Sequence, residues 1–293
     1  GKLSLEIIDP KPFSTEEDRA VGFGLKGVPL NETGELGYLG LAGNNTTDDI
    51  DVIGFLQPQR EQFLEYDLTR LIYNLAHPKK KVIGLVSGLP IDADPLKKYK
   101  PWAVIEQMKQ FFEIRPMGLE PKITDDVDVL LIVHPIGLTD TARYAIDQFV
   151  VRGGKTMVFV DPYAEEGTRS NQAMRLPPDQ GSDLSTLFKG WGINYTTEQI
   201  MGDLGSAQRV SAGVDDLGKP IITDYVAWVT LRPERFAKDD VITGELRLIN
   251  MASSGFISKA KDAPITLEPL ISSSKDAAPV DAKKVRFQPD PSK

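Results

Sequence analysis

The chain has 293 residues, of which 41% are hydrophobic and 26% are charged. A length of about 100 to 200 residues per domain predicts two domains with ordinary hydrophobic cores. The net charge of -8 argues against a nucleic-acid partner and against attachment to anionic lipid by charge. The absence of cysteine excludes disulfides, thiolate zinc sites, redox pairs and cysteine nucleophiles.

The chain has no apolar run of about 18 residues, so no segment of it is predicted to span a bilayer. It starts at Gly1 without Met and without a charged and apolar leader. We therefore expect a piece of a longer protein.

Residues 1–80 are predicted to begin with a strand, a helix and a hairpin. Leu3 to Ile8 is an apolar run, and Ser14 and Glu17 have the spacing of a capping box before a helix. The strand-like runs 38–42 and 52–56 flank residues that favour turns.

A longer helix is predicted from Arg60 to Ala76, because large aliphatic residues recur there with a helical period. The stripe consists of Leu64, Leu68, Leu71, Ile72 and Leu75. The order β-α-β-β-α is that of the C-terminal half of a thioredoxin-like fold. Residues 1–80 are therefore predicted to be a partial thioredoxin-like domain that lacks the half with the redox motif.

Residues 81–215 alternate apolar strands with helices, which predicts a doubly wound, mostly parallel α/β sheet of flavodoxin-like type. The predicted strands are 82–87, 114–117, 127–133 and 156–160, with a short one near Ile193. The predicted helices are 102–112, one capped by Thr139 and ended by Gly153-Gly154, and 183–191.

Residues 216–293 are predicted to form a β-rich extension and a polar tail. Strand-like pieces occur at 221–231 and 241–249, separated by polar turns. Residues 261–293 are rich in Pro, Ser, Lys and Asp, and we expect them to lie on the surface or to belong to a further element.

The candidate ligand-binding residues are Ser87, Gly88, His134 and Asp161. In an open α/β sheet, ligands bind beyond the carboxyl ends of the strands, where the strand order reverses. If strand 114–117 lies at the edge and 82–87 neighbours 127–133, these residues surround that point. The interpretation that we favour is that they satisfy loop backbone groups; a non-catalytic ligand pocket is the alternative.

The sequence does not predict an enzyme. Ser87, His134 and Asp161 suggest a catalytic triad, but the G-x-S-x-G turn is absent and Pro135 follows the candidate base. No phosphate-binding loop is present. The two histidines, His77 and His134, lie in separate segments, which argues against a zinc site. We therefore predict no catalytic residues, no metal and no cofactor.

Three stretches resemble the GldG-like family, the auxiliary, substrate-binding-like component of gliding-motility ABC transport systems. They are Pro58 to Tyr73 (PQREQFLEYDLTRLIY), Val82 to Pro90 (VIGLVSGLP), and Tyr144 to Gly154 (YAIDQFVVRGG) running into Phe159-Val160-Asp161-Pro162. In that family the extracytoplasmic region resembles a domain of an intraflagellar transport protein, and membrane helices flank it.

The resemblance implies a non-catalytic component at the periplasmic, extracytoplasmic face of a bacterial inner membrane. Its partners would be an ABC permease and ATPase, with a small-molecule or glycan ligand, and helices outside this chain would anchor the full-length protein. The resemblance also implies amidotransferase-like architecture, although the catalytic Cys and His of true amidotransferases have no counterparts here. An independent glycan- or peptide-binding module is the first alternative, and a degenerate amidotransferase-like enzyme is the second.

Overall fold

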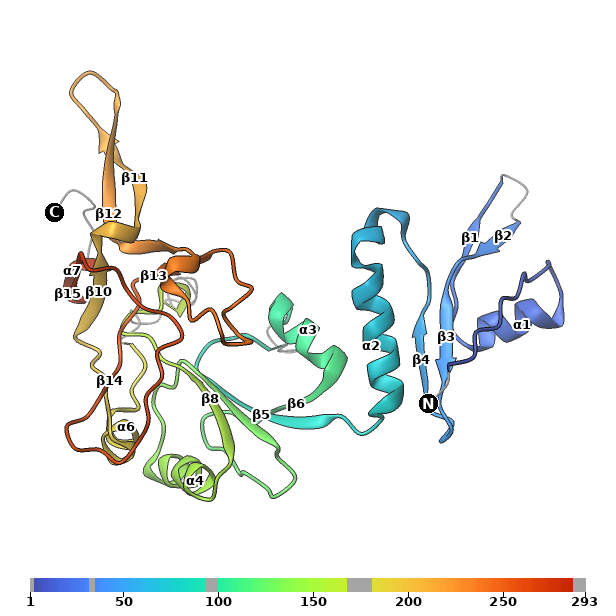
Figure 1. Cartoon of the computed structure of the whole chain (residues 1–293), viewed down its shortest axis with the longest axis horizontal. Helices are drawn as coiled ribbons and strands as arrows, with labels where there is room; N and C mark the ends of the chain where they lie inside the picture. Colours follow the sequence, from blue (N-terminus) through green and yellow to red (C-terminus); the bar gives the residue numbers. More distant parts are fainter. Residues whose placement is uncertain (1–2, 32–34, 93–99, 168–180, 287–293) are drawn as a thin grey trace. The chain divides into compact units, whose positions relative to one another are not determined.

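The computed structural model describes residues 3–31, 35–92, 100–167 and 181–286. The chain divides into two compact units, whose elements are labelled in Figure 1. The first unit comprises Gly1–Lys81 and Gln107–Glu113, and the second comprises Val82–Glu106 and Ile114–Lys293.

Helix α1 (Thr15–Gly22) of the first unit begins at the predicted capping box. The hydroxyl oxygen of Ser14, the N-cap, accepts a hydrogen bond from the backbone N–H of Glu17 at 3.2 Å. The Glu17 carboxylate accepts the backbone N–H of Phe13 at 2.6 Å. The first bond satisfies an amide that the first turn of a helix leaves without a partner, and the second holds the residue that precedes the N-cap.

Two antiparallel hairpins follow α1, and the second corresponds to the predicted one, although its strands lie closer to the turn than the predicted runs 38–42 and 52–56. The first pairs β1 (Gly27–Pro29) with β2 (Leu36–Tyr38), and the second pairs β3 (Leu41–Asn44) with β4 (Ile50–Ile53). The turn of the second is held by Asn45, whose side-chain oxygen accepts the backbone N–H groups of Thr47 and Asp49, each at 2.9 Å.

The predicted long helix is α2 (Leu64–Ala76), preceded by a short 3₁₀ helix η1 (Pro58–Phe63). Leu71 is buried, and α2 packs against β3 and β4, where a Cβ at Gly43 would meet the side chains of Leu71 and Leu75. Leu64 and Ile72 are exposed, so the buried stripe is narrower than the sequence predicts.

The predicted strand at Leu3 to Ile8 is wrong. Among the described residues, 3–9 are exposed and belong to no strand, and Ile7 retains 88% of its accessible surface. A short apolar run forms a strand only where another strand pairs with it, and none of the described strands does so here. The first unit therefore lacks the opening element of the predicted β-α-β-β-α order.

The second unit contains a parallel sheet formed by four of the predicted strands, whereas the predicted strand near Ile193 pairs antiparallel with residues 258–259 and lies outside this sheet. Its strands are β5 (Lys81–Ser87), β6 (Phe112–Pro116), β7 (Val129–Val133) and β8 (Lys155–Phe159), in the order β6-β5-β7-β8. The register pairs Ser87 with Val133 and Val133 with Phe159, all in parallel. Residues 82–86 of β5 are buried without a break, as expected for a strand covered on both faces.

The helices between and after these strands are α3 (Ala103–Phe111), α4 (Asp140–Val151) and α6 (Ser185–Trp191). Thr139 caps α4 as predicted, since its hydroxyl accepts the backbone N–H of Ala142 at 3.2 Å. Helices α4 and α6 pack with β5 and β7 in one core. Its fully buried members include Val86, Leu130, Ile132, Ile146 and Leu184.

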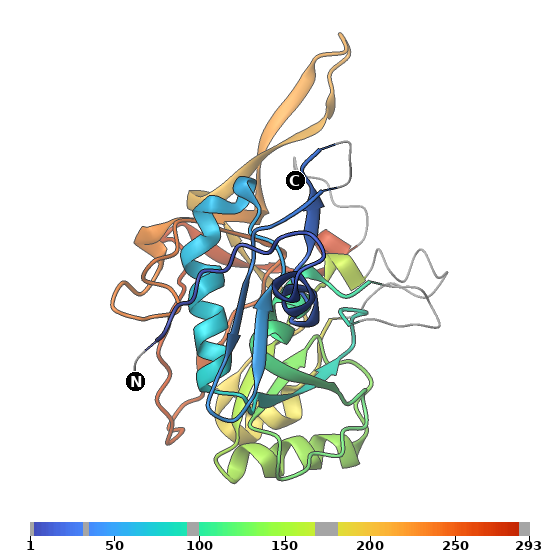
Figure 2. The same ribbon diagram turned by 90° about the vertical axis from the view of Figure 1, so that its right-hand side faces the viewer.

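The rest of the second unit is mostly antiparallel. Its strands are β9 (Ile193–Asn194), β10 (Gln199–Asp203), β11 (Ala207–Val214), β12 (Pro220–Leu231), β13 (Ile249–Ala252), β14 (Ser258–Lys259) and β15 (Ala277–Asp281). Short helical segments are η2 (Leu204–Ser206), η3 (Pro233–Arg235) and α7 (Lys283–Arg286). The β11–β12 hairpin extends away from the rest of its unit in both views (Figures 1 and 2).

The C-terminal residues differ from the sequence-based prediction in two ways. Residues 241–248 are not a strand; they form turns and irregular chain, and the strand at this place is Ile249–Ala252. Within the predicted polar tail, β15 pairs with β10, and Ala282 and Val285 are buried. Pairing with a strand about 75 residues earlier is a tertiary effect that a local pattern does not contain.

Candidate functional site

The four predicted site residues come together at one edge of the parallel sheet. The strand order places β6 on one side of β5 and places β7 and β8 on the other, so the order reverses between β5 and β7. The backbone N–H of Gly88 donates to Val133, and that of His134 donates to Phe159. The sheet order on which the site prediction depends is therefore confirmed. Whether these residues bind a ligand stays a prediction.

Ser87 and Gly88 form a tight turn at the end of β5. The Ser87 hydroxyl donates to the carbonyl of Leu89 at 2.9 Å and accepts the backbone N–H of Leu89 at 3.1 Å. A Cβ at Gly88 would collide with the carbonyl oxygen of His134, so the close approach of the two loops requires glycine. Both residues keep part of their surface exposed.

His134 is buried beneath this edge, with 2% of its surface accessible and a left-handed backbone (φ 47°). Its Nδ1 lies 2.8 Å from the hydroxyl oxygen of Ser182, which is itself inaccessible. The Ser182 hydroxyl also accepts the backbone N–H of Asp161 at 2.8 Å. His134 is thereby tied to the segment that crosses the ends of β7 and β8.

Asp161 and Pro162 follow β8 and are held by residues from distant parts of the chain. The carbonyl of Asp161 accepts the backbone N–H of Ser182 at 2.8 Å, and its carboxylate accepts the backbone N–H of Tyr163 at 3.1 Å. The Arg286 guanidinium donates to the carbonyl of Pro162 and, at 2.7 Å, to that of Thr197. Arg286 thus fixes the loop after β8 from the C-terminal helix.

Tyr195 places a phenol in the same cluster. Burial raises the pKa of Tyr195 well above its ordinary value, and the negative charges of Asp161 and Asp183 raise it further. The phenol therefore stays protonated at neutral pH.

Ser182 and His134 connect the loops at this edge of the sheet. Ser182 and His134 form the nucleophile-and-base type of pair, but both are buried, and a nucleophile must reach its substrate. Within residues 3–31, 35–92, 100–167 and 181–286, no group of three or more His, Asp or Glu side chains could hold a metal ion.

Sequence reasoning missed Ser182, Tyr195 and Arg286. Ser182 lies 48 residues from His134, and Arg286 lies 124 residues from Pro162. Neither residue stands in a motif, and Arg286 lies within the predicted polar tail. The loop between β8 and α6 was the available signal, because loops at this edge of an α/β sheet commonly carry site residues.

A protein-family model matches the part of the chain that contains this cluster. Residues 80–293 correspond to the family described as an ABC-type uncharacterized transport system. The chain belongs to this family, which indicates an auxiliary component of an ABC-type transport system. The predicted link to ABC transport is confirmed at this level; the gliding-motility assignment stays a prediction.

A relative from Borreliella burgdorferi (strain B31), described as an uncharacterized protein, is 25% identical over 221 residues. The alignment covers 73% of this chain but 41% of the relative, so this chain spans less than half of that protein. No solved structure matches the chain. In the part of the chain that the structure describes, no helix is long and apolar enough to cross a membrane.

Proposed function

We propose that this chain is a non-catalytic, extracytoplasmic auxiliary and binding component of a bacterial ABC transport system of the gliding-motility type. The match of residues 80–293 to the transport family is the observation that carries the proposal. The sequence has no phosphate-binding loop, so the ATP chemistry is assigned to a partner ATPase and the translocation path to a permease.

The ligand-binding part of the proposal places the site at the edge where the strand order reverses. Numbered from β5, the sheet order is 2-1-3-4, which supports a flavodoxin- or amidotransferase-like type of sheet. We propose that a small-molecule or glycan ligand contacts Ser87, Gly88 and Asp161, which are half-buried at this edge. His134 lies beneath them and holds the surrounding loops through Ser182.

Partner binding is tested by recovering the full-length protein from bacterial membranes with a tag and identifying what accompanies it. The expected result is co-purification of the permease and the ATPase of one ABC system. Failure to recover either subunit would argue for an independent binding module.

The location is tested with a single introduced cysteine, because this chain has none. Val241, which is 96% exposed, is replaced by Cys in the full-length protein, and intact cells are treated with a membrane-impermeant maleimide in an outer-membrane-permeable strain. Labelling is expected without lysis. The matched control is Ile200→Cys at a fully buried position, which should react only after denaturation. Labelling of Val241→Cys only after lysis would contradict an extracytoplasmic location.

The non-catalytic assignment is tested by turnover assays on glutamine, ATP and simple esters with the purified chain. No turnover is expected. Turnover that disappears in Ser182→Ala or His134→Ala, but persists in a variant of an exposed hydroxyl such as Thr15→Ala, would show that the buried pair is catalytic.

A further inference from the structure

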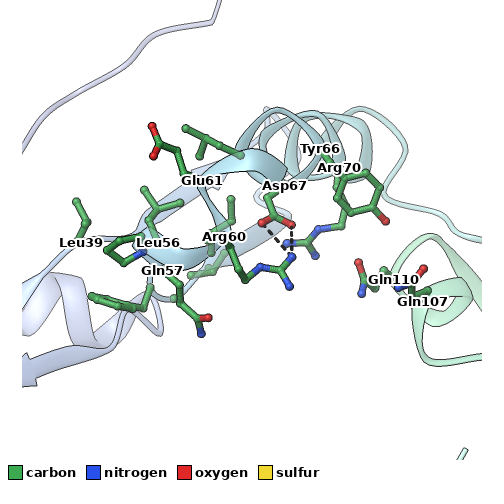
Figure 3. A pocket seen from close by; sticks show the side chains of 16 residues that line it. Leu39, Leu56, Gln57, Arg60, Glu61, Tyr66, Asp67, Arg70, Gln107 and Gln110 are labelled. Atoms are coloured by element: carbon green, nitrogen blue, oxygen red, sulfur yellow. Dashed lines mark hydrogen bonds and ion pairs between the residues drawn. The ribbon is translucent and has the colours of Figure 1, made fainter. Parts of the chain in front are cut away.

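A pocket of about 790 Å³ lies within the first unit, and none of its lining residues belongs to the cluster described above (Figure 3). One wall follows β4, the second is formed by η1 and the first half of α2, and the third is the end of α3. Small-molecule sites commonly have volumes of about 300 to 1,000 Å³. The pocket is therefore large enough for a ligand of several residues.

The two arginines of the pocket differ in their partners. The Nη2 atom of Arg60 lies 3.4 Å from the carboxylate of Asp67. The guanidinium of Arg60 also lies over the ring of Phe63, 5.4 Å from the ring centroid. The Nε of Arg70 is buried without a hydrogen-bond partner, and no described residue forms an ion pair with its guanidinium. A partly desolvated cation without a partner is unfavourable. Arg70 therefore leaves one positive charge uncompensated in the pocket.

Side-chain amides face Arg70 from the other wall. Gln107 and Gln110 of α3 point into the pocket from the side opposite α2 (Figure 3). The end of α3 is fixed against α2, because the ring of Phe111 contacts those of Tyr66 and Tyr73 edge-on, with centroids 6.1 and 6.0 Å apart. Each glutamine offers both a donor and an acceptor, which matches the two polar groups of a peptide bond.

Apolar side chains complete the lining of the pocket, and its charged side chains limit the ligand charge that fits. Leu39 and Leu56 line the pocket beside Arg60, and Glu61 points away from the two arginines in Figure 3. Because Asp67 is already paired with Arg60, one positive charge remains, and a ligand with one negative charge balances it. A dianionic phosphate would leave one negative charge unmatched next to Asp67.

We propose that this pocket binds the C-terminal end of a peptide. Arg70 holds the terminal carboxylate through its planar guanidinium, which matches a carboxylate with two parallel hydrogen bonds. Gln107 and Gln110 bind the last peptide groups, and the leucines contact an apolar terminal side chain. The proposal concerns the first unit and does not rest on the transport role proposed for the family region.

The test is calorimetric titration of the whole chain with acetyl-glycyl-leucine and with the same compound as its C-terminal amide. The acid is expected to bind at least about tenfold more tightly, because only the acid offers a charge-assisted pair to Arg70. Acetate alone and inorganic phosphate are titrated separately. Both are expected to bind at least about tenfold more weakly than the acid, because they leave the amide and apolar walls empty or mismatch the charge.

Variants of Arg70 and Gln110 separate the role of the α2 wall from that of the α3 wall. Arg70→Gln should remove the difference between acid and amide, Arg70→Lys should retain part of it, and Gln110→Ala should weaken both compounds alike. The matched control is Arg19→Gln, an exposed arginine of the same unit outside the pocket, which should bind as the parent does. Hydrogen exchange of α2 establishes that each variant remains folded.

Three results would overturn the proposal. The first is equal affinity for the acid and the amide. The second is no binding of either compound at about 10 mM, a concentration above the dissociation constant expected of a specific site. The third is phosphate or acetate binding as tightly as the acid, which would define a simple anion site instead. The recovery of transporter subunits from membranes does not affect any of these three results. The peptide-binding proposal and the transport proposal can therefore fail independently of each other.

Discussion

In the first unit, the described residues with buried apolar side chains are Ala20, Ile53 and Leu71, whereas in the second unit they run through β5, β7, α4 and α6. The hairpin strands of the first unit are mostly half-buried or exposed, whereas the central strands β5 and β7 of the parallel sheet are buried. Most of the apolar burial that stabilises a fold therefore lies in the second unit. The comparison teaches that the pocket with an unpaired arginine belongs to the less tightly packed unit.

The largest effect is expected for Ile146→Ala, in the middle of α4. Ile146 is fully buried in the core of the second unit, and removing such a side chain leaves a cavity that costs about 3 to 5 kcal/mol. Urea unfolding followed by tryptophan fluorescence measures this, because all three tryptophans lie in the second unit. Val151→Ala on the same helix, 68% exposed, should change stability by less than about 0.5 kcal/mol.

Leu71→Ala should unfold the first unit selectively, at a cost of about 2 to 4 kcal/mol. Leu71 is the buried residue of α2, and Leu68 on the same stripe is half-buried, so Leu68→Ala should cost less. Hydrogen exchange of α2 amides is expected to accelerate while the tryptophan transition stays unchanged. If the urea midpoint followed by tryptophan fluorescence also fell, the result would contradict independent stability of the two units.

We predict that Asp203 makes the free energy of unfolding of the second unit fall in acid. Burial by itself would raise the pKa of Asp203, but hydrogen bonds from the Ser274 hydroxyl (2.5 Å) and backbone N–H (2.7 Å), with others from Ser206 and Gly205, outweigh it and lower the pKa. A depressed pKa contributes stability above the unfolded value of about 3.9, and that stability is lost as the pH falls through the folded pKa.

The measurement is the urea midpoint of parent and Asp203→Asn between about pH 7 and pH 3. At neutral pH the variant should be less stable by about 1 to 3 kcal/mol, because an amide turned toward the Ser274 N–H cannot accept both bonds. The gap should narrow in acid. A gap that is constant with pH would show that the Asp203 charge does not stabilise the fold.

The smallest effects compare two helix caps of the same kind. Ser14 caps α1 and Thr139 caps α4, each accepting one backbone N–H at 3.2 Å. Ser14→Ala and Thr139→Ala should each cost about 1 kcal/mol. The Ser14 change should appear as local fraying of α1 in hydrogen exchange, and the Thr139 change as a shift of the tryptophan transition. The reverse assignment would mean that α4, not α1, opens locally.

The elements that the sequence predicted well are those with a strong local signal. The capping box at Ser14, the apolar period of α2 and the buried runs of β5 and β7 each depend on neighbours within one turn or one strand. The elements that it mispredicted, 3–8 and 241–248, are apolar stretches without a pairing partner among the described residues. Strand formation depends on that partner.

For the candidate site, the sequence by itself determined which strands end in polar residues, but it gave the sheet order only as a condition. The structure supplied that order, which places Ser87, Gly88, His134 and Asp161 at one edge. Only the tertiary structure decided that Ser182 and Arg286 complete the cluster, because each arrives through long-range chain closure. The same holds for the pocket of the first unit. Gln107 and Gln110 reach the pocket of Arg70 from α3, and local sequence carries no information about such a long-range placement.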